Sequence, residues 1–349
     1  MCDQLSKFAK KTFLFLPFVD QRYLNKNLRK EYNIKYKFKA QSIFKNKKNM
    51  NFFYRIFFAL KVFFIISKAY KKEKCVIVSR SIISSLVLSL FQIKNYLELH
   101  HDLKGFTKHI FKLTNFNFVK RNINYILLHR NLLTLYPHKK KNYLILDDAV
   151  DLRHFKKFKK INLKNKNSFA CSYFGSLTKG KGIEIIDSLS KKLKNIQFHI
   201  YGDLNFYNEI INNENKNITF YGHIPYSKIP KYMSKYDVCL MPYLKKVSVR
   251  SSNLETSKYM SPLKLFDYLA SCKIIIASNL NVYSHILKNN FNSILIPYNS
   301  ENIWCKKIIE VRNNIKKYSF LKKNAYKTAL KFTWEQRTKK IIKHFETSL

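Results

Sequence analysis

Short apolar runs alternate with longer stretches of charged, amphipathic sequence along this chain. The first half contains five apolar runs: TFLFLPF (12–18), CVIVSR (75–80), YLELHH (96–101), YILLHR (125–130) and YLILDD (143–148). The second half contains six: SFACSYFG (168–175), IQFHIYGD (196–203), ITFYGH (218–223), VCLMPY (238–243), KIIIAS (273–278) and SILIPY (293–298). Continuous apolar runs separated by helical lengths indicate parallel strands buried on both faces. The pattern therefore predicts an α/β protein.

The order of these runs predicts two doubly wound domains. A polar, basic stretch, KKFKKINLKNKN (156–167), separates the two series and is the predicted linker. Residues 1–155 then form a first Rossmann-like domain and residues 168–330 a second one, and a long helical tail with Trp334 inside it ends the chain. Because ligands of such sheets bind beyond the carboxyl ends of the strands, we expect the site where the two domains face each other.

The composition adds a strong positive charge to this picture. The chain has 66 Lys and Arg against 21 Asp and Glu, a net charge of +45. This favours a polyanionic partner, either nucleic acid, an acidic membrane or a phosphorylated substrate. A codon bias toward A and T, which enriches Lys, Asn, Ile, Phe and Tyr, explains the charge equally well. The hydrophobic content of 46% argues against disorder and supports two cores in 349 residues.

The cysteines and the most apolar stretch bear on location. Six cysteines are scattered without a Cys-x-x-Cys pair, and the N-terminus lacks the apolar core of a signal peptide, so we expect a reduced cytoplasmic protein. Arg55 and Lys61 interrupt the run 52–67, which falls short of the ~18 apolar residues of a spanning helix. It reads either as a helix covering a sheet or as a helix resting peripherally on an anionic membrane surface at the inner face.

Glycine is concentrated in one turn. Three of only six glycines, Gly175, Gly180 and Gly182, fall within the stretch FGSLTKGKGIEII (174–186), between a predicted strand and a predicted helix. Glycine lets the backbone approach a ligand, and a helix N-terminus attracts phosphate, to which Lys179 and Lys181 add charge. The alternative is an ordinary tight turn. A P-loop is disfavoured, because Gly182 stands where a magnesium-binding Ser or Thr is required.

A second helix start lies in SPLKLFDYLA (261–270). The sequence predicts Ser261 as the N-cap and Pro262 as the first helical residue, with Lys264 beside the free N–H groups. This is a second candidate anion site. Asp267 follows on the same helix face, where a carboxylate is suited to ribose hydroxyls. Taken alone, the segment reads equally well as a capped helix with exposed side chains.

Over roughly residues 75–345 the chain resembles the retaining glycosyltransferases of family 4. The similar stretches run in the family's order: YFGSLTKGKGIEII, ITFYGHIPYSKIPKYMSKYDVCLMPY, SPLKLFDYLASCKIIIAS and FTWEQRTKKII, with VIVSRS, LELHHD and LILDDAVDLRHF upstream. The resemblance implies the GT-B fold, two Rossmann-like domains facing across a cleft. It also implies that a C-terminal helix at 331–349 packs back on the first, acceptor-side domain.

The resemblance assigns roles to individual residues. Lys264 and the amides near Leu263 hold the donor diphosphate, with Lys181 as a second cation, and His100 lies near the donor sugar. Asp267 takes the ribose. The implied donor-binding set is Gly175, Ser176, Gly222, His223, Ser261, Leu263 and Asp267, and the implied catalytic set is His100, Lys181 and Lys264.

Two features depart from the family pattern. The family often has two Glu residues separated by seven, but here Tyr259 and Asp267 occupy those places. No glycine precedes Gly105, so the family's glycine-rich first loop is missing. The contact with the donor sugar and the handling of the acceptor are therefore open.

The expected activity is hexosyl transfer from a nucleotide-diphosphate sugar to a glycan or lipid-linked acceptor, in polysaccharide synthesis. Cations and helix-end amides stabilise a leaving diphosphate without a metal. The sequence has no Asp-x-Asp, and adjacent His100 and His101 point to opposite sides of a strand, so we expect neither metal nor cofactor. Two alternatives are a non-catalytic nucleotide-sugar binder and a basic nucleic-acid-binding protein. Because the charge is spread and no binding module is recognisable, nucleic acid is not the expected partner.

Overall fold

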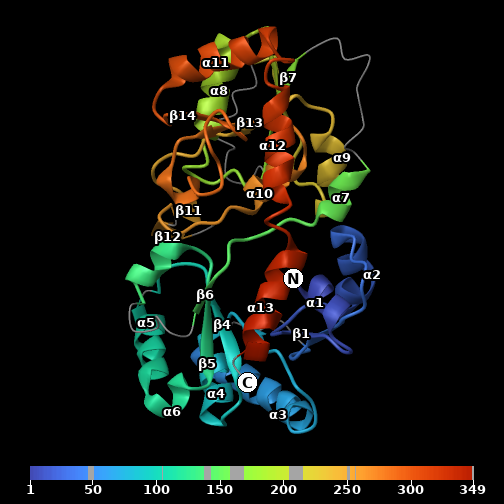
Figure 1. The fold of residues 1–349 in the computed structure, drawn as a ribbon, viewed down its shortest axis with the longest axis vertical. Coiled ribbons are helices and arrows are strands. Elements are labelled where there is room, and N and C mark those ends of the chain that lie inside the picture. The colour runs from blue at the N-terminus through green and yellow to red at the C-terminus, as the bar shows by residue number, and fades with distance from the viewer. Residues whose placement is uncertain are drawn as a thin grey trace. The chain divides into compact units, whose positions relative to one another are not determined.

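The computed structural model describes residues 1–45, 51–103, 105–136, 143–157, 169–203, 215–249, 252–255 and 257–347. The chain forms two compact units (Figure 1). Unit 1 consists of Met1–Asp147 and Trp334–Leu349, and unit 2 consists of Asp148–Thr333.

The first boundary between the units differs from the sequence-based one. Residues 148–155 were expected in the first domain, but they belong to unit 2. The backbone N–H of Val150 donates to the carbonyl of Phe332 at 3.0 Å, and Val150 and Phe155 lie in a unit 2 core. Of the predicted linker, residue 156 ends α7 (Leu152–Lys156), and residues 158–167 lie outside the described residues.

Unit 2 is built on a six-stranded parallel sheet. Its strands are β7 (Ala170–Phe174), β8 (Gln197–Tyr201), β9 (Ile218–Phe220), β10 (Val238–Met241), β13 (Ile274–Ser278) and β14 (Ile294–Ile296). All six predicted strands of the second half are confirmed. The order is β14-β13-β10-β7-β8-β9, and each neighbouring pair is parallel. From β7 the chain adds β8 and β9 on one side of the sheet, and then adds β10, β13 and β14 on the other side. The place between β7 and β10 is therefore the topological switch point, where such folds bind ligands.

Alternation along the central strands produces two cores. One hydrophobic cluster contains Cys171, Tyr173, Val238 and Leu240. The apolar residues next to them in the chain belong to a second cluster, on the opposite face of the sheet. Helices α8 (Ile183–Lys192) and α11 (Glu301–Asn313) cover the first face, and α10 (Leu263–Ala270) and α12 (Ser319–Ala329) cover the second (Figure 1). Because side chains alternate across a sheet, a continuous apolar strand must be covered on both sides.

Three short elements of unit 2 flank β10 in the chain. Helix α9 (Ile229–Met233) precedes β10, and an antiparallel pair, β11 (Ser248–Val249) and β12 (Ser252–Glu255), follows it. The sequence analysis did not predict this pair, because β12 (SNLE) has a single apolar residue among its four and lacks the apolar run that marks a strand.

Unit 1 contains two separate parallel sheets. Strands β3 (Val78–Ser79), β4 (Asn95–Leu99), β5 (Ile123–Leu127) and β6 (Tyr143–Ile145) pair in sequential order. Strand β1 (Phe13–Leu16) pairs with β2 (Lys39–Ser42) in a sheet of two. The helices before α7 are α1 (Cys2–Phe8), α2 (Gln21–Tyr32), α3 (Phe52–Tyr70), α4 (Ile82–Leu90), α5 (Gly105–Lys112) and α6 (Asn117–Lys120).

The predicted helical tail is three helices. After α11 and α12, α13 (Trp334–Thr347) begins at Trp334 and belongs to unit 1. Its Ile341 and Phe345 pack with Tyr96, Ile126 and Leu146. The amphipathic face of α13 therefore completes the core on one face of the β3–β6 sheet.

Helix α3, which contains the long apolar stretch of the first half, carries three cations, Arg55, Lys61 and Lys68. Within the described ranges, no helix combines the length and the apolar character that crossing a bilayer requires.

Candidate functional site

Glycines mark the carboxyl edge of the unit 2 sheet. Gly175 follows β7, Gly202 follows β8, and Gly222 lies two residues beyond β9. The Gly175 N–H donates to the carbonyl of Tyr201, and the Gly202 N–H donates to the carbonyl of Gly222, both at 2.9 Å. A Cβ atom at position 202 would overlap the carbonyl oxygen of Gly175. Glycine therefore lets three strand ends pack closely at the edge where a ligand is expected.

Gly180 and Gly182 have a packing role in the turn. Both have positive φ angles, +85° and +80°, and Gly182 is the N-cap of α8. A Cβ atom would strike the carbonyl of Lys246 at position 180 and the carbonyl of Pro242 at position 182. The turn after β7 thus packs directly on the segment after β10. The sequence analysis explained the three glycines of the turn by approach to phosphate, with an ordinary tight turn as the alternative. The structure shows that packing on the segment after β10 is enough to require glycine at positions 180 and 182.

Lys264, in the first turn of α10, lies over Gly175. A Cβ atom at position 175 would be 2.6 Å from the Lys264 Cε and 2.7 Å from its Nζ, and Gly175 has a φ of +134°. Because real Cβ atoms essentially never approach so closely, only glycine leaves room for this ammonium. The structure therefore brings a cation of α10 to the end of β7, at the switch point.

The Lys264 ammonium is buried, although the residue as a whole is partly exposed. Its Nζ has no hydrogen-bond partner among the described residues. It lies 3.6 Å from the ring centroid of Tyr173 and 5.1 Å from that of Tyr243, so the rings give only cation–π stabilisation. Burial, and secondly the charge of Lys181, lower the pKa of Lys264 well below its ordinary value. An anion at this position would relieve both effects.

Lys181 reaches the same place from the glycine turn. Its Nζ donates to the Ser176 hydroxyl at 2.5 Å, and its charge acts on Lys264. The Ser176 carbonyl accepts from the Tyr173 hydroxyl at 2.9 Å, which ties the turn to β7. The structure therefore brings together Gly175, Ser176, Lys181 and Lys264. The positive charges of the two lysines lie close enough to act on each other.

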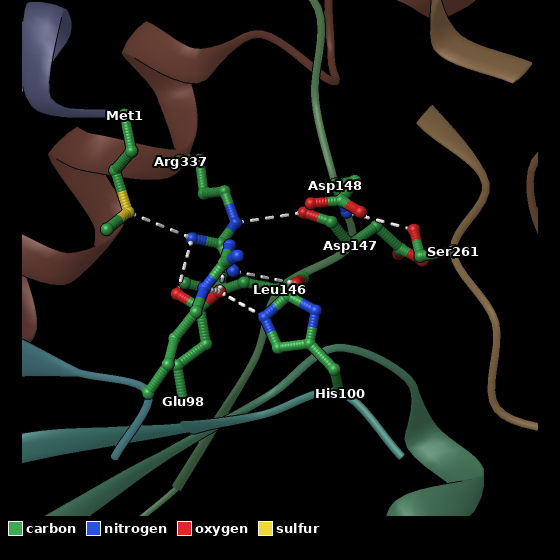
Figure 2. Close-up of polar contacts among 9 residues, drawn as sticks. Met1, Glu98, His100, Leu146, Asp147, Asp148, Ser261 and Arg337 are labelled. Carbon is green, nitrogen blue, oxygen red and sulfur yellow. Dashed lines mark hydrogen bonds and ion pairs between the residues drawn. The ribbon is translucent and has the colours of Figure 1, made fainter. Parts of the chain in front are cut away.

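Ser261 is not the side-chain cap that the sequence predicted. Helix α10 begins at Leu263 with Pro262 as N-cap, and Ser261 instead accepts from the backbone N–H of Asp148 at 2.9 Å (Figure 2). The hydroxyl thus fixes the incoming chain of unit 2, and among the described residues no side chain caps the start of α10. Leu263, with 53% of its surface exposed, lies at this end.

Asp267 lies one turn farther along α10 and is buried. Its Oδ1 accepts from the Tyr226 hydroxyl at 2.8 Å. Burial raises the pKa of Asp267 to about 7, although this hydrogen bond acts in the opposite direction. Tyr226 lies beside the ring of His154, with centroids 5.5 Å apart. The carboxylate is therefore held in place by a tyrosine that the sequence analysis did not single out.

Gly222 and His223 lie at the end of β9. Gly222 has a φ of +70° and open space where a Cβ would point, and His223 is exposed. Next to them, rings from three neighbouring strands stack: Phe174 on Tyr201 at 4.6 Å, and Tyr201 on Tyr221 at 4.5 Å. The end of β9 therefore packs on neighbouring rings and leaves open space beside the backbone of Gly222.

Comparison with known proteins identifies the family. The profile of the family described as glycosyl transferases group 1 matches residues 154–328, half of the chain. The chain belongs to the glycosyl transferases group 1. The matched range covers the glycine turn, Lys264 and Asp267, so this glycosyltransferase carries the candidate site inside its family domain. No curated protein matches the sequence at significant similarity.

Solved structures establish the fold. A glycosyltransferase from Rickettsia africae has a TM-score of 0.74 at 16% identity, covering 99% of this chain and 92% of its own. Anabaena HepE in complex with UDP and glucose has 0.69 at 15%, covering 100% and 95%. Sucrose-phosphate synthase from Thermosynechococcus elongatus has 0.71 at 14%, covering 99% and 91%. The glycosyltransferase thus has the GT-B fold, as the sequence resemblance implied.

His100 belongs to unit 1 of the glycosyltransferase, just beyond the end of β4. Its Nε2 lies 2.5 Å from Oε1 of Glu98 (Figure 2). Glu98 also contacts Arg80 at 3.0 Å and Arg337 of α13 at 3.4 Å. Burial alone would raise the pKa of Glu98, but the His100 hydrogen bond and the two arginines hold it below its ordinary value. His100 is therefore oriented by a buried carboxylate.

Sequence reasoning missed several residues that build these surroundings. Tyr173 and Tyr243 flank Lys264, and Tyr226 donates a hydrogen bond to Asp267. Glu98, which is paired with Arg337, contacts the ring of His100. Glu98 could have been found, because a carboxylate inside an apolar strand needs a buried partner. The tyrosines carry no such signal in a chain that has 23 of them.

Proposed function

We propose that this glycosyltransferase moves a hexosyl group from a nucleotide-diphosphate sugar to a glycan or lipid-linked acceptor, with retention of configuration and without a metal. The observation that carries the proposal is the buried Lys264 ammonium, which lacks a hydrogen-bond partner among the described residues and adjoins Lys181 at the switch point. Buried cations are expensive unless an anion pairs with them. A diphosphate supplies that anion.

We assign the roles of the residues from the family resemblance, and the contacts around Lys264 and Asp267 in unit 2 support this assignment. Lys264, Lys181 and the first amides of α10 hold the diphosphate, and Asp267 accepts the ribose hydroxyls. The backbone at Gly222 and His223 borders the base. In unit 1, His100 contacts the donor sugar while Glu98 fixes its ring. A nucleotide-sugar donor is supported by the structural neighbour HepE, whose structure contains UDP-glucose. A glycan or lipid-linked acceptor is supported by the neighbour WaaB, a lipopolysaccharide outer core galactosyltransferase.

The transfer is a substitution at the anomeric carbon. The bond between that carbon and the diphosphate oxygen breaks, and the bond to the acceptor hydroxyl oxygen forms. The acceptor proton passes to the departing diphosphate, which becomes more basic as the bond breaks. Lys264 and Lys181 stabilise the growing negative charge in a water-poor setting, where electrostatic effects are strong.

Nucleotide binding tests the proposal. Titration of UDP, GDP and ADP should raise the melting temperature of the protein for at least one nucleotide, by mass action on the folded state. Lys264→Met should remove the shift, while Lys68→Met, on the exposed side of α3, should preserve it. A full shift in Lys264→Met would contradict the site, and no shift with any nucleotide would contradict the donor class.

Proton uptake gives an independent readout of the same lysine. Because the pKa of Lys264 is lowered in the free protein and a diphosphate would raise it, binding should take up protons at pH values between the pKa of the free and of the bound protein. Calorimetry in two buffers of different ionisation enthalpy measures this uptake, which Lys264→Met should abolish.

Two rival functions predict different outcomes. A non-catalytic binder would bind the nucleotide sugar but show neither transfer nor slow hydrolysis by NMR. A nucleic-acid-binding protein, which the charge of +45 suggests, would bind duplex DNA more tightly than any nucleotide at physiological salt.

A further inference from the structure

Unit 1 contains a cavity of about 1960 Å³, open to solvent on one side, that the proposed donor site does not use. Its lining comes from α1, β1, α3, β3, the start of α4, α5 and the end of α13. This volume exceeds the roughly 300–1,000 Å³ of pockets for small molecules. Figure 1 shows α1 and β1 close to α13 in unit 1, and α1 contacts α13.

The walls of the cavity are apolar and incompletely covered. The four residues of β1 are all apolar, yet none is buried, and Phe13 has 48% of its surface exposed. On the facing wall Val76, Ile77 and Val78 are only partly buried. By contrast, every residue of β4 and β7 is buried. Large apolar side chains that remain accessible inside a unit indicate a site for an apolar ligand.

The arrangement of sheets explains the space. Strand β1 pairs with β2, and in the part of the chain that the structure describes, these two strands form a sheet apart from β3–β6. A single continuous sheet would bring β1 within about 5 Å of a neighbouring strand and close the gap. The two sheets instead leave an elongated apolar space between them.

Cations line this apolar space. The charged lining residues are Lys10, Lys11, Arg55, Lys74, Arg80, Glu73 and Glu346, so positive charges outnumber negative ones. Arg80 and His101 lie just beyond β3 and β4, at the same strand ends as His100. The cavity therefore combines hydrocarbon walls with a positive lining that reaches the carboxyl edge of the unit 1 sheet.

We propose that this cavity binds a long-chain amphiphile with an anionic head, a hydrocarbon chain carrying phosphate. The chain lies between β1, α3 and β3, and the head meets the cations. The further step, that this molecule carries the acceptor hydroxyl, rests on the proposed function; the binding itself does not.

Binding of alkyl phosphates tests the cavity directly. Octyl, decyl and dodecyl phosphate, each below its micelle concentration, should displace a fluorescent fatty acid from the protein. Each buried CH₂ contributes about 0.8 kcal/mol, so affinity should rise about fourfold per CH₂ and about fifteenfold per pair. An affinity independent of chain length would overturn the proposal, because surface lysines alone would produce that result.

Variants locate the bound chain. Ala69 lines the cavity from α3, so Ala69→Trp should fill part of it and weaken dodecyl phosphate about fifteenfold, the worth of roughly two CH₂ groups. Ser67→Trp, on another face of the same helix, is the matched control and should leave binding unchanged. Equal effects of the two substitutions would place the chain elsewhere.

Charge reversal tests the head. Lys10→Glu with Lys11→Glu should weaken dodecyl phosphate several-fold and leave dodecanol unchanged. Lys68→Glu with Lys72→Glu, outside the cavity lining, should change neither. If the second pair weakens binding instead, the ligand is a lipid surface held by α3 and the cavity proposal fails.

Nucleotide binding at the unit 2 site distinguishes a failure of this proposal from a failure of the proposed function. A variant that loses alkyl phosphate but keeps its nucleotide-induced melting shift is folded and specifically impaired in unit 1. Loss of nucleotide binding with intact alkyl phosphate binding would reject the proposed function alone.

Discussion

Lys264 and Gly175 form the most informative residue pair in the molecule. One is a cation in the first turn of a helix, and the other is a glycine after a strand ninety residues earlier in the chain. Neither residue type is unusual by itself. Their contact is diagnostic because the ammonium occupies the volume that any side chain at position 175 would need.

Gly175→Ala should therefore displace the Lys264 ammonium. The new methyl group would lie 2.6 Å from Cε in a backbone region that disfavours side chains, so we expect loss of nucleotide binding and about 1–3 kcal/mol of destabilisation. Gly105→Ala is the control, because its positive φ is similar in kind but nothing lies within 4 Å. Thermal shift with and without nucleotide measures both effects. Comparable nucleotide affinity in the two variants would disprove the steric argument.

Asp267→Asn should stabilise the free protein at alkaline pH. Burial raises the pKa of Asp267 from 3.8 to about 7. Below pH ~4 both folded and unfolded chains are protonated there, and between about 4 and 7 only the unfolded chain ionises, so stability is lost as pH rises. The variant removes this loss, about 2–4 kcal/mol at pH 8 and much less at pH 5.

Urea unfolding at the two pH values measures the difference. Asp187→Asn, which removes the partner of Lys191 on α8, should show no comparable dependence. A constant effect of Asp267→Asn across this range would mean that the carboxylate is already ionised in the folded state.

At the scale of elements, α13 is held by one buried arginine. Arg337 donates to the carbonyl of Asp147 at 3.0 Å and that of Leu146 at 3.3 Å, and pairs with Glu98 (Figure 2). It therefore joins the last helix to the end of β6 and to β4 within unit 1. The amphipathic face of α13 supplies the burial, and Arg337 fixes the position.

Arg337→Met should lower the free energy of unfolding by about 2–4 kcal/mol, because it removes one of the two arginines paired with the buried Glu98 carboxylate and leaves the carbonyls of Leu146 and Asp147 without their donor. The double variant with Glu98→Gln should recover part of this loss, since no buried charge remains uncompensated. Arg312→Met, on the exposed side of α11, should change stability by less than about 0.5 kcal/mol. Urea unfolding monitored by circular dichroism measures all three. Additive losses in the double variant would show that the two groups do not interact.

Element prediction from the sequence succeeded where apolar runs were continuous. All six unit 2 strands were found because burial on both faces leaves an uninterrupted run. The β11–β12 pair was missed because polar strands lack that run, and the tail was taken as one helical stretch because turns at its breaks contain no glycine or proline. The sequence also predicted β1 but not its partner, since pairing depends on distant residues.

At the scale of the whole molecule, the charge of +45 acts on stability through self-repulsion. The screening length falls from about 10 Å at 0.1 M salt to about 3 Å at 1 M. We therefore expect the melting temperature to rise as NaCl is added over this range, and to rise equally with KCl. A fall would show that specific ion pairs outweigh the general repulsion.

The same charge should not dominate donor binding. Lys264 and Lys181 lie together at the candidate site in unit 2, whereas most of the other lysines are spread over the surface. Nucleotide affinity should therefore respond far more to Lys264→Met than to any surface substitution of the same type.

The sequence by itself determined the fold class, most strands, the family and the candidate phosphate-binding segments, because periodicity, glycine spacing and motif order are local properties. Only the tertiary structure decided that Ser261 fixes Asp148 rather than capping α10, that Gly180 and Gly182 serve packing, and that the Lys264 ammonium is buried beside Gly175. Each of these depends on contacts between residues far apart in the chain. Burial, and with it the pKa values of Lys264 and Asp267, exists only once the strands and helices have packed.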